Sequence, residues 1–181
     1  MRGHATQPID PSSTSELPYR LACLCDLRDQ RGRILMLDRV RSPNRGLSSP
    51  IGGKLDTLSG ESPAECAQRE IEEEALIRIP LSRLHFGGII SERAFEGRGH
   101  WLMFYFRVLG AVTVEEREME EGTLRWHSPE ELDSLPLPET DRQVIWPLIK
   151  ACEPVQGTDD RPGFFSAHID CRGDDISWTA D

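Results

Sequence analysis

The stretch that decides the fold runs from residue 61 to residue 76 and reads ESPAECAQREIEEEAL. Ser62 fits the N-cap of a helix, Pro63 fits its first position and Glu65 fits its third, and together they make a helix-start signature. The sequence therefore predicts a helix from Pro63 to about Ala75.

Three carboxylates gather on one face of this predicted helix. At 100° per residue, with Glu70 taken as zero, Glu73 falls at about 300° and Glu74 at about 40°, so the three share a sector of roughly 100°. The neighbouring strip consists of small and apolar residues that let the helix lie close to a sheet, namely Ala64, Ala67, Ile71 and Ala75. Like charges on adjacent turns repel one another unless a cation compensates. The pattern favours a bound divalent cation, and the alternative is a solvated helix face, which is the commoner fate of acidic runs.

The chemistry of such a face points to phosphate transfer. Oxygen ligands select Mg²⁺, with Mn²⁺ as a substitute, and a site with few protein ligands leaves room for water and substrate phosphates. A metal held there neutralises a diphosphate and activates a water, whose proton a spare carboxylate takes. Just upstream, Gly52 and Gly53 permit a tight backbone that brings a carbonyl and the Lys54 ammonium to the same end. For Lys54, an ordinary surface lysine is an equal alternative.

This stretch resembles the signature of the Nudix hydrolase family, in which a glycine, a glutamate and an Arg-Glu-hydrophobe-any-Glu-Glu block have fixed places. The matching residues are Gly53, Glu61 and the block from Arg69 to Glu74. Seven residues, rather than the usual five, separate Gly53 from Glu61, which lengthens a turn before the helix. Leu76 stands where the family has glycine, so the sequence disfavours a left-handed helix cap. No signature carboxylate is lost.

The resemblance implies a fold and a set of site residues. The expected fold is an α/β/α sandwich with a mixed β-sheet between helices. Glu70, Glu73 and Glu74 are implied as metal ligands, with Arg69 orienting one of them and the Gly53 carbonyl completing the shell. A role for Glu70 as the general base is the alternative to its role as a ligand.

The family commonly adds a carboxylate from a later loop. Residues 118–122 read EMEEG and precede Trp126 in the corresponding position. The resemblance favours Glu121 as this further ligand and catalytic residue, with Glu120 and Glu118 as rivals. A solvated charge run is again the alternative.

The C-terminal half resembles the branch of the family that hydrolyses oxidised purine nucleoside triphosphates such as 8-oxo-dGTP. The resemblance rests on residues 135–141, 145–148 and 163–165. In that branch an acidic residue before the last helix reads the purine edge, and Asp141 is the candidate here. A carboxyl group accepts hydrogen bonds from ring or exocyclic N–H groups and donates one when protonated. A helix N-terminal acid beside Thr140 is the equal alternative for this residue.

Periodicity along the rest of the chain predicts the remaining elements. Two apolar runs at 21–27 and 34–37 are expected to form a hairpin around a glycine-containing turn. The other expected elements are strands at 84–91, 101–108 and 165–171 and helices at 128–132 and 141–151. Because strands and helices interleave, the sheet should be covered on both faces.

Length, charge and cysteine content limit the number of domains, the kinds of partner and the cellular compartment. The 181 residues fit one domain, 18–181, which ends in a strand extension and follows a flexible polar tail at 1–17. With 21 Lys+Arg against 31 Asp+Glu the net charge is −10, which argues against long nucleic acids as partners. No stretch is apolar enough for a signal peptide or a membrane span, so no membrane partner is expected. Five cysteines without a CxxC pair fit a reducing cytoplasm.

Residues and resemblance together predict a cytoplasmic, Mg²⁺-dependent pyrophosphohydrolase that splits a nucleoside triphosphate into monophosphate and pyrophosphate. A homodimer is expected only by analogy with other members of the family. One alternative is that the same site acts on another nucleoside diphosphate-linked substrate, such as a nucleotide sugar, a dinucleoside polyphosphate or capped RNA. A second alternative is a non-catalytic module that binds a nucleotide and regulates a partner; the intact carboxylates argue against it, whereas Leu76 and the longer loop keep it open.

Overall fold

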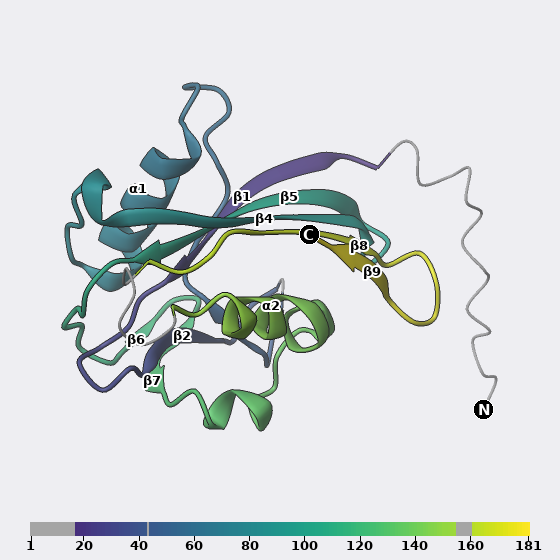
Figure 1. The fold of residues 1–181 in the computed structure, drawn as a ribbon. Helices are drawn as coiled ribbons and strands as arrows, with labels where there is room; N and C mark the ends of the chain where they lie inside the picture. Colours follow the sequence, from purple (N-terminus) through teal and green to yellow (C-terminus); the bar gives the residue numbers. More distant parts are fainter. Residues whose placement is uncertain (1–16, 43, 155–160) are drawn as a thin grey trace.

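The strands form two sheets in the computed structural model, which describes residues 17–42, 44–154 and 161–181 (Figure 1). The strands of the larger sheet are β1 (Tyr19–Asp26), β4 (Leu84–Phe95), β5 (Gly99–Val108), β8 (Phe165–Asp170) and β9 (Ser177–Ala180). The smaller sheet contains β2 (Ile34–Arg39), β3 (Ser48–Pro50), β6 (Arg117–Met119) and β7 (Gly122–His127). The larger sheet has the order β1-β5-β4-β8-β9 and the smaller one β3-β2-β7-β6. The larger sheet is mixed, because β1 runs parallel to β5 and β8 parallel to β4.

Two α-helices cover this sheet. They are α1 (Pro63–Ala75) and α2 (Trp146–Ala151), and a π-helical turn, η4 (Asp141–Ile145), leads into α2. Along β1, Ala22 packs in the hydrophobic cluster that includes α2, whereas the next residue, Cys23, packs in the cluster that includes α1. Successive side chains of a strand point to opposite faces. The two helices therefore lie on opposite faces, and the expected α/β sandwich with a mixed sheet is confirmed.

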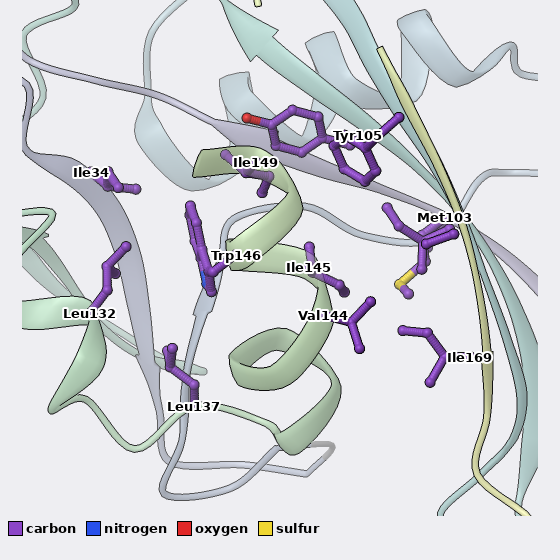
Figure 2. Close-up of a cluster of buried hydrophobic side chains, with 14 of the residues drawn as sticks. Ile34, Met103, Tyr105, Leu132, Leu137, Val144, Ile145, Trp146, Ile149 and Ile169 are labelled. Atoms are coloured by element: carbon purple, nitrogen blue, oxygen red, sulfur yellow. The ribbon is translucent and has the colours of Figure 1, made fainter. Parts of the chain in front are cut away.

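The core on the α2 face is built from side chains of η4 and α2 that meet those of the sheet (Figure 2). Val144 and Ile145 point toward Met103 of β5 and Ile169 of β8. Trp146 is almost fully buried in the same cluster. Burial of each large apolar side chain stabilises the fold by roughly 1.5–3 kcal/mol, so this core fixes η4 against the sheet.

Helix α1 begins and ends where the sequence predicts. The backbone N–H of Glu65 donates to Ser62 Oγ at 3.3 Å, and the N–H of Ser62 donates to Glu65 Oε2 at 2.9 Å, which forms a capping box. Leu76 overturns the expectation about the far end, because it adopts the left-handed conformation with φ 56° and ψ 29°. Its side chain is 67% exposed, so it meets little steric resistance, and the helix keeps the cap without glycine.

The expected hairpin at 21–27 and 34–37 is wrong. β1 pairs with β5 along its whole length, from Tyr19 opposite His100 to Asp26 opposite Arg107, whereas β2 pairs with β3 and β7 in the other sheet. The ends of the two runs meet only locally, at the bridge between Arg28 and Ile34 and at the hydrogen bond from the Leu35 N–H to the Leu27 carbonyl. The long-range pairings form because each strand then buries its apolar side chains within a sheet of several strands, which an isolated hairpin would not provide.

Other elements differ from the sequence prediction in extent. The helix expected at 128–132 is a 3-10 turn, η3 (Glu131–Asp133), and the helix expected at 141–151 starts with π-helical hydrogen bonding. The strands expected at 84–91, 101–108 and 165–171 are confirmed as β4, β5 and β8. The N-terminal tail, apart from residue 17, lies outside the described residues.

A buried charge network joins β1, β5 and the chain after α2. Asp26 is fully buried and accepts hydrogen bonds from Tyr105 Oη at 2.7 Å and Arg107 Nε at 2.8 Å. Burial alone would raise the pKa of Asp26, but Arg107 and Arg28 outweigh it and hold that pKa below its usual range. Arg107 Nη2 also donates to Glu153 at 2.6 Å, so one guanidinium joins Asp26 of β1 to the segment that follows α2.

Asp26→Asn should lower the free energy of unfolding by about 3–5 kcal/mol, because it removes the fully buried charge partner of Arg107 and leaves this guanidinium paired only with the more exposed Glu153. Tyr105→Phe removes only one hydrogen bond of the same network and should cost about 1 kcal/mol. Urea denaturation of the two variants measures the difference. Equal losses would show that the ion pair adds nothing beyond a neutral contact.

Candidate functional site

One cavity, of about 590 Å³, collects nearly all the predicted site residues. The predicted residues in its wall are Gly53, Lys54, Glu70, Glu73, Glu74, Glu121 and Asp141. They come from the segment after β3, from α1, from the β6–β7 turn and from η4. Arg69 is the predicted residue that does not line the cavity, and it reaches the carboxylates from the side.

Two glycines allow the segment after β3 to lie against β1 and α1. The Cys23 N–H donates to the Gly53 carbonyl at 2.8 Å, and the Cys25 N–H donates to the Ile51 carbonyl at 2.8 Å. Gly52 has φ +144°, and a Cβ there would lie 2.2 Å from the carbonyl oxygen of Cys23. A Cβ on Gly53 would lie 2.2 Å from Glu70 Oε1. Gly52 therefore has no space for a side chain, whereas a side chain at position 53 would require the Glu70 carboxylate to move.

Arg69 holds the acidic face in place. Its Nε and Nη2 donate to the two oxygens of Glu61 at 2.8 and 3.0 Å, and its Nη1 donates to Glu70 Oε1 at 2.7 Å. The same Nη1 lies 3.3 Å from Glu73 Oε2, and Nη2 donates to the Lys54 carbonyl at 3.1 Å. The hydrogen bonds from Arg69 lower the pKa of Glu61. These contacts agree with the predicted orienting role of Arg69, and they give Glu61 a role as its anchor.

The remaining carboxylates crowd together in partly dry surroundings. Burial raises the pKa of Glu70, and burial together with the charges of Glu70 and Glu121 raises the pKa of Glu74 to about 7. Glu74 Oε2 accepts the Gly52 N–H at 3.0 Å. Because each negative charge opposes its neighbours, a cation bound among them would relieve the repulsion.

The β6–β7 turn also contributes Glu121 to the cavity wall. Arg39 Nη2, at the end of β2, contacts Glu121 Oε2 at 3.0 Å, and both side chains line the cavity. The rival Glu120 is paired with Arg41 on the surface instead. Sequence reasoning missed Arg39, because nothing in the local pattern of β2 marks it as different from the other arginines nearby.

The donor set fits a hard divalent cation, since it consists of carboxylate oxygens from Glu70, Glu73, Glu74 and Glu121. Across 17–42, 44–154 and 161–181, no three acidic, histidine or cysteine side chains are already arranged as ligands of one ion. Arg69 and the Gly52 N–H hold the carboxylates in their present positions. The carbonyl of Gly53, which is also predicted as a ligand, accepts the Cys23 N–H at 2.8 Å and keeps a second lone pair.

A second acidic group lines another part of the cavity wall. Asp141 is the first residue of η4, is buried and lines the cavity, and its role as the reader of the purine edge stays a prediction. Glu92 of β4 and Thr140 are buried in the same wall, and sequence reasoning missed both of them. No local pattern reveals them, because only the packing of η4 on β4 brings the three together.

Comparison with known proteins gives the family. Residues 18–151 match the family described as NUDIX domain, which covers well over half of the chain. The chain belongs to the Nudix family. Nudix proteins are hydrolases that act on phosphoanhydride bonds of small nucleotides and generally use divalent cations. No helix in the described part of this one is long and apolar enough to cross a membrane.

Several relatives and solved structures resemble this Nudix protein. The uncharacterized Nudix hydrolase YvcI of Bacillus subtilis strain 168 is 30% identical over 129 residues, which span 70% of this chain and 77% of the relative. The crystal structure of a mutator MutT protein from Bacillus halodurans superposes with a TM-score of 0.68 at 25% identity, over 90% of this chain and 97% of that one. The crystal structure of a MutT protein from Methanosarcina mazei Go1 superposes with a TM-score of 0.59 at 26% identity, over 70% of this chain and 90% of that one.

Gly53→Ala should displace the Glu70 carboxylate, since the added Cβ meets Glu70 Oε1. The melting temperature should change by only about 2 °C, because a flexible side chain can give way. Turnover should fall by about 100-fold, since small displacements at a reacting centre cost about that much. Mn²⁺ binding, followed by electron paramagnetic resonance, should weaken in parallel. Gly163→Ala, where the added Cβ makes only ordinary contacts, is the control, and a Gly53 variant that matches it would contradict the packing argument.

Proposed function

We propose that this Nudix protein is a Mg²⁺-dependent pyrophosphohydrolase that cleaves a purine nucleoside triphosphate, with 8-oxo-dGTP as the leading candidate, into monophosphate and pyrophosphate. One observation carries the proposal: a single cavity combines the carboxylates of α1 and Glu121 with a wall that contains the buried Glu92 and Asp141 and two half-buried aromatic side chains, Phe95 and Trp101. The first part suits a metal-bound polyphosphate, and the second suits a flat, hydrogen-bonding base. The resemblance to MutT structures at 25% and 26% identity supports the same assignment.

The acidic side chains of the cavity are the proposed ligands of the cation. Glu70, Glu73, Glu74 and Glu121 would hold Mg²⁺, with Mn²⁺ as a substitute. When bound, the ion supplies charge neutralisation to the phosphates and to the attacking water. Arg69 fixes Glu70 and Glu73 in position through its contacts with both.

The remaining steps fall to residues around this cluster. A carboxylate of α1 accepts the proton of the attacking water, and Lys54 in the cavity wall contacts the phosphate oxygens. Arg39 positions Glu121 through its ion pair. The broken bond is the phosphoanhydride that releases pyrophosphate.

The setting of the enzyme follows from its chemistry. A net charge of −10 favours small nucleotides, drawn in with their metal, over long nucleic acids. We place the protein in a reducing cytoplasm, which is supported by its five free cysteines; Cys23 and Cys66 lie 3.3 Å apart without forming a disulfide. A homodimer stays a prediction from family habit.

The decisive experiment follows the release of pyrophosphate and phosphate, with and without Mg²⁺, from a panel of 8-oxo-dGTP, the four ordinary dNTPs, ADP-ribose and a dinucleoside polyphosphate. We expect Mg²⁺-dependent pyrophosphate release, fastest from the oxidised purine triphosphate. Turnover of ADP-ribose or the dinucleoside polyphosphate instead would replace the substrate. If the protein hydrolyses no compound of the panel but still binds a nucleotide, a non-catalytic regulatory module would be favoured.

Glu73→Gln should reduce turnover by at least about 100-fold, because it removes an anionic ligand from the cation site. Its side chain is largely exposed, so the melting temperature should shift by no more than about 2 °C. Glu72→Gln is the matched control on the same helix, since Glu72 faces away and pairs with Arg78 on the surface. A Glu73 variant as active as the Glu72 variant would remove Glu73 from the metal site.

A further inference from the structure

The last turn of α1 carries acidic side chains at the end of the helix where negative charge is least favourable. This turn contains Glu72, Glu73 and Glu74, and no basic residue lies in it. The C-terminal end of a helix has a partial negative charge, because its last carbonyl groups have no hydrogen-bond partner within the helix. The turn that presents the proposed cation ligands therefore requires a positive group and hydrogen-bond donors from elsewhere in the chain.

Arg117 of β6 supplies both the charge and the donors. Its Nη2 donates to the backbone carbonyl of Glu74, and the same nitrogen lies 3.4 Å from the backbone carbonyl oxygen of Glu73. Both contacts are made to the backbone. The guanidinium therefore holds the helix end and leaves the carboxylate oxygens of both glutamates available to the cavity that they line.

The strand that carries Arg117 leads directly into the turn that carries Glu121. β6 and β7 pair with each other on both sides of this tight turn, so Glu121 stays close to the end of β6. The Val40 N–H donates to the Glu121 carbonyl at 2.8 Å, and Arg39 Nη2 donates to Glu121 Oε2 at 3.0 Å. The turn is thus fixed to the end of β2 on one side and, through Arg117, to α1 on the other.

We propose that Arg117 is the positioning residue that sets the distance between the two halves of the cation site. One half is the end of α1 with Glu73 and Glu74, and the other half is the β6–β7 turn with Glu121. This inference rests on the proposed function, because it takes these carboxylates to be ligands of a divalent cation. Arg117 belongs to the smaller sheet, whereas α1 packs on β1 of the larger sheet, so its contact joins the two layers that carry the ligands.

A fixed distance between the two halves matters most for a small cation. Mg²⁺ requires nearly ideal octahedral geometry with short metal–oxygen distances, whereas Ca²⁺ accepts more ligands in a looser arrangement. If Arg117 sets the geometry, its loss should weaken the binding of Mg²⁺ more than that of Ca²⁺. A residue that serves only the stability of the fold would not change the relative affinities of the two ions.

Mn²⁺ binding, followed by electron paramagnetic resonance, and the displacement of Mn²⁺ by Mg²⁺ or Ca²⁺ test the inference without nucleotide or turnover. Arg117→Met should weaken Mg²⁺ binding by about 10-fold or more, since the loss of a group that orients metal ligands generally costs that much. Ca²⁺ binding should weaken by no more than about 3-fold, because its coordination is flexible. Equal losses for the two ions, or no loss for either, would overturn the inference.

Two further variants separate fixed geometry from charge. Arg78→Met removes a positive charge just after the same helix, where Arg78 pairs with Glu72 on the surface, and it should leave both ion affinities unchanged. Arg117→Lys keeps the charge but replaces the rigid guanidinium by a flexible ammonium, so it should weaken Mg²⁺ binding by about 3-fold. This variant is also informative if the methionine variant does not fold. Ion affinities like those of the wild type in Arg117→Lys would show that charge alone is required and would contradict the positioning role.

The cap of α1 provides a separate control for stability. Leu76 adopts the left-handed conformation there, in which glycine is more favourable than leucine. Arg117→Met should lower the melting temperature by about 2–4 °C, and the addition of Leu76→Gly should restore part of this loss without restoring Mg²⁺ affinity. A double variant that regains both would show that Arg117 only stabilises the helix end, and it would overturn the inference.

Turnover distinguishes the failure of this inference from the failure of the proposed function. Arg117 is not among the residues that line the cavity, so Arg117→Met should lower kcat with Mg²⁺ by about 10-fold or more and change the nucleotide KM by less than about 3-fold. Hydrolysis by Arg117→Met at the rate of Arg78→Met would overturn the positioning role and leave the hydrolase standing. A changed preference between Mg²⁺ and Ca²⁺, without hydrolysis of any nucleotide by the wild type, would support the positioning role and overturn the proposed function.

Discussion

The close approach of helix α1 to the larger sheet is the constraint on which the rest of the site depends. Its packing strip consists of small side chains, so Cys66 and Ala67 are buried against β1. The backbone at Gly52 and Gly53 then touches both β1 and Glu70 with no space for a Cβ. This contact sets where the carboxylates stand, because the helix cannot move away from the strand without opening the core on that face.

The cavity contains two groups of acidic side chains, and the repulsion between negative charges is reduced in a different way in each group. Among the α1 carboxylates, Arg69 balances part of the charge and leaves oxygen atoms directed into the cavity, where a hard cation is the natural partner. At Glu92 and Asp141, burial raises the pKa of each carboxyl group, to about 7 and about 8. One region therefore suits a hard cation, and the other favours uncharged carboxyl groups.

Sequence patterns correctly predicted the features that depend on interactions between residues close together in the chain. The capping box of Ser62 and Glu65 fixes the start of α1 through two backbone hydrogen bonds, so the helix and the face shared by Glu70, Glu73 and Glu74 were predictable. The hairpin prediction failed because β1 finds its partner in β5, far along the chain, and the left-handed cap at Leu76 survived because its side chain faces solvent. Both outcomes depend on surroundings that no short window contains.

The sequence by itself determined the helix, its acidic face and the family of this Nudix protein, because spacing along one helix fixes which side chains share a face. The tertiary structure alone decided which distant residues join them. It brought Glu121 across from the β6–β7 turn with Arg39 as its partner, and it set Asp141 against Glu92 and Thr140 in one buried wall. Those meetings follow from strand order and from the packing of η4 on the sheet, and the burial that shifts the pKa of Asp141 exists only once the chain has folded.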